Sequence, residues 1–261
     1  MKLSLENKYA LVCGSTSGIG EAIAIELAKL GATITLLARN EDKLKKVLQK
    51  LPTTTKENHN YAVADFANTQ QVQETVERLC KERKYHILIN NTGGPKGGPI
   101  INAATQEFTN GFKMHLVTNQ ILTQAVVPSM KEASYGRIIN IISTSVKQPI
   151  DGLGVSNTIR GAVASWSKTM ANELGPHGIT VNNVLPGFTA TPRLASIIST
   201  RSKREDKSEE DVIRTMKSIV PARRFAKPEE VAYAAAFLAS PAAQYINGVN
   251  LPVDGGRTKS L

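Results

Sequence analysis

Cysteine is scarce in this chain, with only Cys13 and Cys80 among 261 residues. Two cysteines do not make the disulfide framework that stabilises many small secreted domains. Cys13 lies in a stretch that predicts a buried strand and Cys80 in one that predicts a helix. We therefore expect two free thiols and a protein of the reducing cytoplasm.

Long apolar runs are also missing. No stretch could span a bilayer, and the opening residues MKLSLENK are polar where a signal peptide would need an apolar segment. No linker, low-complexity tract or internal repeat interrupts the chain. With 41% hydrophobic and 21% charged residues, the composition is that of a globular protein. We expect a single domain over residues 1–261, with no membrane partner and no metal.

Acidic residues are outnumbered, and the formal net charge is +10. Most basic residues alternate with acidic ones, as on a solvated surface. The exception is residues 193–227, where ten Lys and Arg face five Asp and Glu, so half of the net charge lies there. Charge alone does not indicate a nucleic-acid partner, and we expect none. An acidic or phosphorylated partner would fit, and about 193–222 is expected to be a mobile, lid-like segment.

One stretch carries a recognisable motif. Residues 9–20, YALVCGSTSGIG, join an apolar run to a helix through a loop with Gly14, Gly18 and Gly20. Strand, glycine loop and helix in this order can hold a pyrophosphate on backbone N–H groups at the helix N-terminus. The spacing is G-x-x-x-G-x-G, which differs from the usual G-x-G-x-x-G fingerprint. Glycine also ends strands for structural reasons, but this position favours nucleotide binding.

The rest of the chain alternates apolar strands with helices. Further strands are predicted at residues 32–38, 59–65, 86–91, 137–143, 178–186 and 248–256. Helices are predicted at 41–51, 69–84, 104–133 and 155–174, with another from residue 228. Apolar strands alternating with helices indicate an α/β fold, a parallel sheet covered on both faces. Ligands of such a sheet bind beyond the carboxyl ends of its strands.

These residues resemble the short-chain dehydrogenase/reductase family over nearly the whole chain. The matching segments are GSTSGIG at 14–20, Asp65, NNTG at 90–93, PGFTAT at 186–191 and VDGG at 253–256. GRIINIIS, GITVNNVLPG and RRFAKPEEVA are most similar to 3-oxoacyl-acyl-carrier-protein reductases. The resemblance implies a Rossmann-type, doubly wound seven-stranded parallel sheet. It also implies a nicotinamide cofactor and a homotetramer or homodimer.

The resemblance also implies a cofactor site. The pyrophosphate loop corresponds to Gly14, Ser17, Gly18, Ile19 and Gly20. Asp65 and Phe66 match the adenine-contacting pair, although an N-cap aspartate followed by a core aromatic would look the same. Asn91 and Gly93 match the loop beside the adenosine ribose. The segment that faces the nicotinamide carboxamide corresponds to Pro186, Gly187 and Thr189.

Arg39 bears on the choice of cofactor. It follows the strand at 32–38, and neither Ala38 nor Asn40 is acidic. A carboxylate there would bind the ribose 2′-hydroxyl and repel a 2′-phosphate, whereas arginine attracts the phosphate. We expect NADP rather than NAD, unless Arg39 is only a solvated residue at a helix start.

The catalytic positions depart from the family pattern. Ser143 matches the family serine that polarises the carbonyl, but Ser156 stands at the tyrosine position and Arg160 at the lysine position. His115 stands where the family has asparagine, and none of the six tyrosines belongs to a Tyr-x-x-x-Lys motif. A serine hydroxyl is a far weaker acid than a phenol, so Ser156 cannot replace tyrosine. Arg160 keeps a fixed charge suited to a ribose hydroxyl or a cofactor phosphate.

Two residues could supply the proton that reduction of a carbonyl requires. His115 is one, since imidazole titrates near neutral pH, unless it is a half-buried residue bonded on its own helix. Lys147 is the other, unless it is a solvated loop residue. The first hypothesis is thus an NADP-dependent carbonyl reductase, acting on a ketone or a 3-oxoacyl thioester. The thioester could be carried by an acidic acyl-carrier protein. The alternative is a dinucleotide-binding protein that has lost the reaction and serves as a sensor or an oligomer partner.

Overall fold

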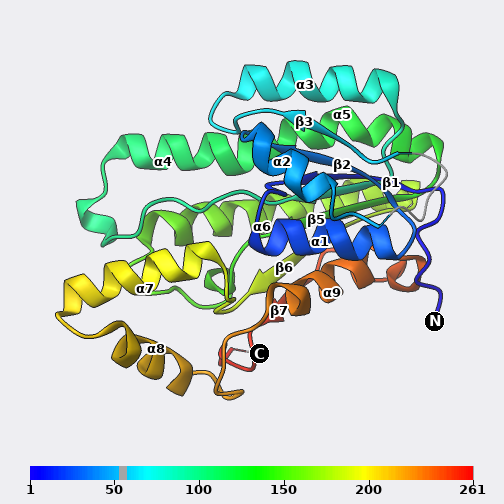
Figure 1. Cartoon of the computed structure of the whole chain (residues 1–261). Helices are drawn as coiled ribbons and strands as arrows, with labels where there is room; N and C mark the ends of the chain where they lie inside the picture. Colours follow the sequence, from blue (N-terminus) through cyan, green and yellow to red (C-terminus); the bar gives the residue numbers. More distant parts are fainter. Residues whose placement is uncertain (53–57, 261) are drawn as a thin grey trace.

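A seven-stranded parallel sheet forms the centre of the computed structural model, which describes residues 1–52 and 58–260. The strands are β1 Tyr9–Cys13, β2 Thr33–Ala38, β3 Asn60–Val63, β4 Ile87–Asn90, β5 Gly136–Ile141, β6 Ile179–Pro186 and β7 Asn250–Val253. Their order across the sheet is β3-β2-β1-β4-β5-β6-β7, and every pairing is parallel (Figure 1). The doubly wound fold expected from the sequence is confirmed.

Two apolar cores lie on opposite faces of the sheet. In β1, Ala10 and Val12 belong to one core and Leu11 and Cys13 to the other, because successive strand side chains point to opposite faces. The first core is covered by α1 Gly18–Lys29, α2 Glu41–Leu48 and α9 Pro228–Ala239. The second is covered by α3 Thr69–Glu82, α5 Thr118–Glu132 and α6 Gly154–Leu174 (Figure 1). Burial on both faces explains why the strands are apolar along their whole length.

The strand order reverses between β1 and β4. The chain runs outward from β1 through β2 to β3 and then returns to place β4 on the other side of β1. The loops after β1 and β4 therefore lie at the carboxyl ends of these strands, on either side of the reversal point, and we call the region above this point the crevice. In open α/β sheets this is where ligands bind, and both loops contain residues that the sequence assigns to the cofactor.

The helix expected over residues 104–133 contains an irregular turn. It consists of α4 Thr105–Phe112, a π-helical turn Lys113–Val117 and α5. The Thr118 backbone N–H bonds to the Lys113 carbonyl, five residues back, and the Thr118 hydroxyl donates to the same oxygen at 3.0 Å. Such turns carry one residue more than a regular helix, and they are frequent at functional sites.

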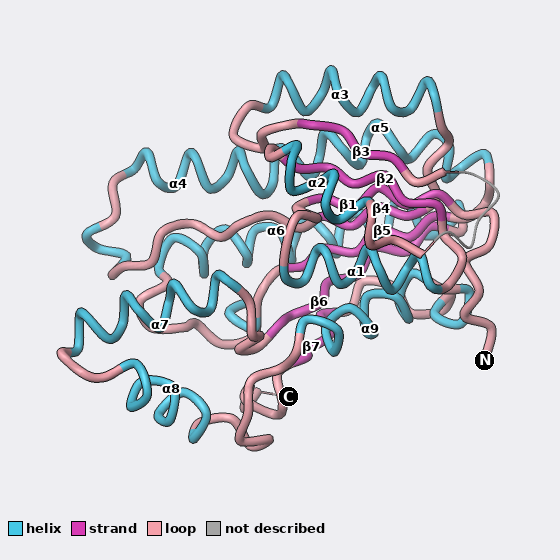
Figure 2. The backbone as a smooth tube through the Cα atoms, viewed as in Figure 1, coloured by secondary structure: helices cyan, strands magenta, loops and turns pink. Residues whose placement is uncertain are grey.

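The segment expected to be mobile is folded into two helices, α7 Pro192–Glu205 and α8 Glu209–Ser218 (Figure 2). A small apolar cluster of its own joins them, formed by Leu194, Ile198, Val212 and Met216. Ion pairs within the segment, such as Arg201–Glu205 at 2.7 Å, neutralise part of its positive charge. The apolar spacing was hidden by the many charged residues between these four positions. We call α7 and α8 together the lid helices.

Two smaller observations concern the cysteines and the length of the apolar helices. Cys13 and Cys80 are both free thiols, as expected. Within residues 1–52 and 58–260, none of the helices combines the length and the apolar character that a membrane span requires.

Candidate cofactor and active site

The glycine loop between β1 and α1 is built for close approach. Gly14 and Gly18 both have φ of +58°, a backbone conformation that residues with a side chain rarely adopt. A Cβ on Gly14 would lie 2.5 Å from the Asn91 carbonyl oxygen, and one on Gly18 would lie 2.9 Å from Thr191 Cγ2. Ser17 is the N-cap of α1, yet its side chain makes no capping hydrogen bond. The backbone N–H groups of the first turn therefore lack a side-chain acceptor, which suits an anion.

Asn91 fixes the two loops of the crevice to each other. Its side-chain Nδ2 donates to the carbonyl oxygens of Cys13 and Gly14, at 3.3 and 3.1 Å. These contacts cross from the end of β4 to the end of β1, so the glycine loop is held in place before any ligand binds. Nearby, Ser15 Oγ is buried with no hydrogen-bond partner among the described residues. The loop residues thus fit a dinucleotide pyrophosphate, both by backbone conformation and by unsatisfied donors.

The residues expected around the adenosine lie at the carboxyl ends of β2 and β3. Arg39 is exposed directly after β2, and the Asn40 side chain caps α2 by accepting from Lys43 N at 2.9 Å. Among described residues, no carboxylate forms an ion pair with Arg39. It is therefore available to an anionic ligand.

Asp65 and Phe66 follow β3. Asp65 is not the N-cap of α3, because Asn68 takes that position and accepts from Gln71 N at 3.1 Å. Asp65 instead accepts from Ala67 N at 3.0 Å and so stabilises the turn between β3 and α3. The Phe66 ring is buried in the core under α3, so the expected core aromatic is confirmed.

The segment after β6 packs against the end of β7. Gly187 N donates to the Val253 carbonyl at 3.0 Å, and a Cβ on Gly187 would lie 2.7 Å from Asp254 Cα. Pro186 ends β6, and the buried Thr189 donates its hydroxyl to the Gly187 carbonyl at 3.3 Å. Two motifs that are more than 60 residues apart in the sequence thus form one corner at the carboxyl edge of the sheet.

Ser143 lies two residues beyond the end of β5, at the same edge. It is half-buried, and its Oγ accepts a hydrogen bond from Ser145 N at 3.1 Å. A hydroxyl has a single hydrogen and two acceptor positions. Accepting from Ser145 leaves that hydrogen available for an incoming carbonyl oxygen. Lys147 follows one short turn later and is exposed.

Arg160 is buried in α6, one turn after Ser156, which is also buried. Its Nη1 donates to the Ile141 carbonyl at 3.1 Å, while its Nε has no partner among the residues that the structure describes. No described carboxylate forms an ion pair with it. Burial, and then the neighbouring charge of Arg193, lower the pKa of Arg160 to about 10. The guanidinium is still protonated at neutral pH and remains a buried, unneutralised charge beside the end of β5.

His115 lies in the π-helical turn and is only 2% exposed. Its ring bonds to the backbone of Gly93, in the loop after β4, and its Nε2 has no partner in the described part of the chain. Burial, and then the Arg160 charge, lower the pKa of the imidazole to about 2. The ring is therefore neutral at neutral pH. The near-neutral titration expected from the sequence assumed a solvated ring, and this pKa does not agree with it.

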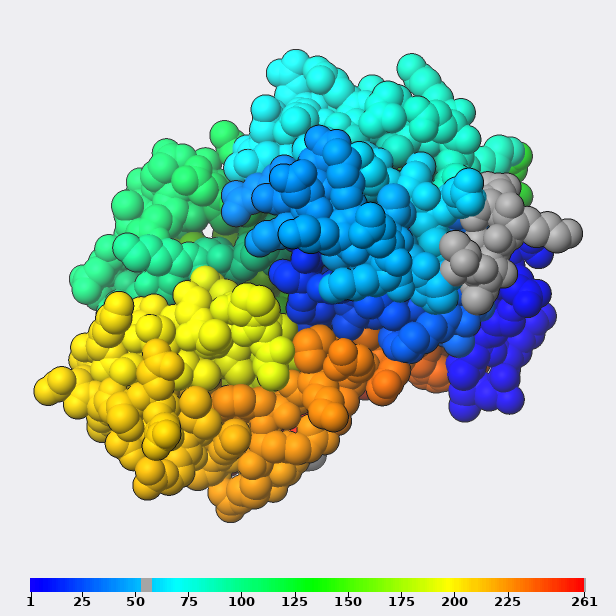
Figure 3. Space-filling view, in the orientation of Figure 1, coloured from blue at the N-terminus to red at the C-terminus, as the bar shows by residue number. Residues whose placement is uncertain are grey.

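Sequence reasoning treated Arg193 only as part of a basic segment. In the structure its Nη2 donates to the Pro95 carbonyl at 2.8 Å, linking α7 to the loop after β4. A Cβ on Gly94 would lie 3.8 Å from Arg160 Nη2 and 3.9 Å from Arg193 Nη2, so both guanidiniums border this loop. In Figure 3 the yellow surface of α7 lies directly below the green surface of the segment after β4. The position of Arg193, two residues after PGFTAT, was the signal that could have indicated its role.

Comparisons with known proteins agree with this architecture. Residues 14–258 match a family model described as enoyl-(acyl carrier protein) reductase. The NADPH-dependent reductase BacG of Bacillus subtilis is 30% identical over 261 residues, covering 98% of this chain and 100% of the relative. The 3-oxoacyl-acyl-carrier-protein reductase FabG of Rickettsia prowazekii is 33% identical over 254 residues, covering 97% of this chain and 98% of the relative.

A solved structure has a similar fold. The L-sorbose reductase of Gluconobacter frateurii, complexed with NADPH and L-sorbose, superposes with a TM-score of 0.93. It is 31% identical, and the match covers 100% of both chains. The similarity therefore includes every element that lines the crevice between β1 and β4.

Proposed function

The chain belongs to the short-chain dehydrogenase/reductase family, and from this we propose that it reduces a carbonyl group with NADPH. It is an oxidoreductase whose cofactor is NADP, in line with its NADPH-dependent relatives and with the exposed Arg39. One observation carries the proposal for the reaction. Ser143 lies at the carboxyl end of β5 with a hydroxyl hydrogen to donate, two residues after Ile141, whose carbonyl accepts from the buried cation Arg160.

Each protein group has a defined task in this proposal. The bound nicotinamide supplies the hydride. Ser143 donates its hydroxyl hydrogen to the substrate carbonyl oxygen and polarises it. Arg160 stabilises the negative charge that develops on this oxygen, because a fixed cation in a buried site needs no reorganisation. Its unpartnered Nε can in addition hold a ribose hydroxyl of the cofactor.

The proton comes from Lys147 or His115, and the environment of His115 favours Lys147. A neutral imidazole that bonds to Gly93 through one nitrogen presents the other, Nε2, as an acceptor. His115 then orients a hydroxyl group rather than giving up a proton. Lys147 is a cation four residues after Ser143, on the loop that borders the same edge.

The alternative is a protein that binds the dinucleotide without turnover, as a sensor or as an oligomer partner. Its support is that three of the four catalytic positions differ from the family pattern, at His115, Ser156 and Arg160. The two functions share the glycine loop and Arg39, so cofactor binding alone does not separate them.

The test is consumption of NADPH, followed by its absorbance, over a panel of ketones, ketoses and acetoacetyl thioesters at pH 5 to 9. The proposal expects turnover with at least one class, and a large loss on Ser143→Ala with NADPH affinity unchanged. Tight NADPH binding, seen as thermal stabilisation that rises with cofactor concentration, with no turnover anywhere would support the alternative instead.

Further partners are proposed on the basis of the family. The substrate could be a 3-oxoacyl thioester on an acidic acyl-carrier protein, given the basic lid helices. We also propose a cytoplasmic homotetramer or homodimer. Ile101 and Phe112, which are 89% and 43% exposed in or beside α4, offer apolar area for such an interface. Light scattering would measure the oligomeric state.

A further inference from the structure

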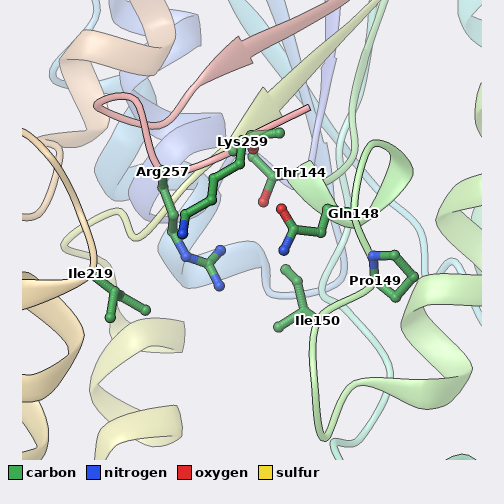
Figure 4. A pocket seen from close by; sticks show the side chains of 8 residues that line it. Thr144, Gln148, Pro149, Ile150, Ile219, Arg257 and Lys259 are labelled. Carbon is green, nitrogen blue, oxygen red and sulfur yellow. The ribbon is translucent and has the colours of Figure 1, made fainter. Parts of the chain in front are cut away.

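A separate cavity of about 160 Å³ lies beside the loop that carries Ser143 (Figure 4). Three segments that are distant in the sequence enclose it, namely the loop after β5, the end of α8 and the chain after β7. Its lining residues are Thr144, Gln148, Pro149, Ile150, Ile219, Arg257, Thr258 and Lys259. The space is partly open to solvent, and its volume is close to that of a cavity that binds benzene.

The cavity contains a polar group without a partner. Thr144, the residue after Ser143, is 2% exposed, and its Oγ1 makes no hydrogen bond with any described residue. Figure 4 shows this hydroxyl, the Gln148 amide and the Arg257 guanidinium pointing into the same space. Leaving a buried hydroxyl without a partner costs free energy, so a ligand atom that bonds to it would be favoured.

The charges around the cavity are positive. Arg257 is half-buried with its guanidinium 4.3 Å from the centre of the Phe188 ring, and Lys259 reaches over the cavity (Figure 4). Asp254 lies near the cavity, and its carboxylate accepts from Gly256 N at 3.0 Å and from Thr258 N at 2.8 Å. Asp254 therefore bends the chain after β7 and brings the two cations to the cavity. Within residues 1–52 and 58–260, no carboxylate forms an ion pair with Arg257 or Lys259.

We propose that this cavity binds an anionic group of the substrate, so that the substrate is a small carbonyl compound bearing a carboxylate or a phosphate. The inference rests on the proposed reduction and narrows its substrate class. Arg257 and Lys259 neutralise the anion, and Thr144 and Gln148 donate hydrogen bonds to it. Ile150 and Ile219 contact the carbons that connect it to the carbonyl. Because Thr144 follows Ser143 directly, binding the anion brings the carbonyl next to the group that polarises it.

The test compares pairs of carbonyl substrates in which one member carries the anionic group and the other does not. Acetoacetate is paired with methyl acetoacetate, and dihydroxyacetone phosphate with dihydroxyacetone, which also distinguishes a carboxylate from a phosphate. For at least one pair, kcat/KM should be about 10- to 100-fold higher for the anionic member, as expected for hydrogen bonds to a charged group. Arg257→Gln should remove this preference by lowering kcat/KM for the anionic member, and Arg257→Lys should restore part of it. Arg78→Gln, the same change on the exposed side of α3, should have no effect.

A binding measurement separates this inference from the proposed reduction. Calorimetry with 3-hydroxybutyrate and with inorganic phosphate, in the presence of NADPH, needs no turnover, because the reduced cofactor cannot accept a hydride from the alcohol. If no carbonyl is reduced but either anion binds and Arg257→Gln abolishes the binding, the reduction is wrong and the anion site stands. If neutral and anionic members are reduced equally well, or if neither anion binds and no pair shows a preference, the anion site is wrong.

Discussion

Arg193 on α7 donates its Nη2 to the carbonyl oxygen of Pro95 at 2.8 Å, a hydrogen bond between residues 98 apart in the sequence. It joins the first lid helix to the loop that follows β4. A second contact lies at the other end of α7, where the Arg204 guanidinium lies beside Gly152 in the loop before α6. These contacts place α7 along the carboxyl edge of the sheet, over the crevice assigned to the cofactor.

Loss of the Arg193 contact should loosen α7. An exposed hydrogen bond contributes about 1 kcal/mol, so Arg193→Gln should speed amide hydrogen exchange in residues 192–205 about fivefold by local opening. Arg214→Gln removes an exposed charge from α8 and should leave α7 unchanged. Equal exchange in wild type and Arg193→Gln would mean that the lid is held by its apolar cluster alone.

Arg39 should determine the preference for NADPH. Arg39→Glu replaces a cation by an anion next to the expected 2′-phosphate, so the affinity for NADPH should fall about 10- to 100-fold while that for NADH is kept. Fluorescence titration of both cofactors measures this, with Lys46→Ala on the exposed side of α2 as the control. A variant that still prefers NADPH would show that another residue binds the 2′-phosphate.

His115 should make the fold sensitive to acid. Its pKa is lowered from 6.5 to about 2, so the unfolded chain takes up a proton below pH 6.5 while the folded protein does not. The stability is therefore complete above pH 6.5 and is lost as the pH falls, by about 2 kcal/mol between pH 7 and 5 for this one group. His86, whose pKa burial lowers to about 4, acts in the same direction.

Urea unfolding at pH 7 and pH 5 measures this effect. His115→Asn should reduce the difference between the two free energies of unfolding by about 2 kcal/mol, whatever its effect at pH 7. His177→Gln, at an exposed position after α6, should leave the difference as it is in the wild type. An unchanged difference in His115→Asn would contradict the neutral, buried imidazole.

Lys147 should matter more than His115 for proton transfer. Loss of a general acid lowers rates by about 100-fold or more, so Lys147→Met should lower kcat to this extent with the NADPH affinity unchanged. His115→Asn should reduce kcat less, since a neutral ring only orients its neighbours. The pH profile of kcat for the wild type should show no inflection near pH 6.5 that depends on His115. An inflection near pH 6.5 that is present in the wild type and absent in His115→Asn would mean that the imidazole is the donor.

The sequence was sufficient for the sheet, the glycine loop and the position of Ser143, because apolar strands and glycine spacing are local signals. It was not sufficient for three features that depend on contacts between distant residues. The burial that lowers the pKa of His115 comes from packing around a π-helical turn. The Arg193–Pro95 bond joins α7 to a distant loop, and the turn before Arg257 is held by hydrogen bonds to Asp254. The lid helices were missed because their charges outnumber the four apolar residues that pair them.

The π-helical turn at Lys113–Val117 makes the site depend on chain length as well as on side chains. The turn holds one surplus residue, so deleting a single residue there would give an unbroken α-helix from α4 to α5. Each residue of such a helix turns the chain by about 100°. The deletion would keep α5 on the sheet and swing α4 around the helix axis, away from the loops it now borders. Insertions and deletions in this helix are thus a means of reshaping the crevice without replacing any of its residues.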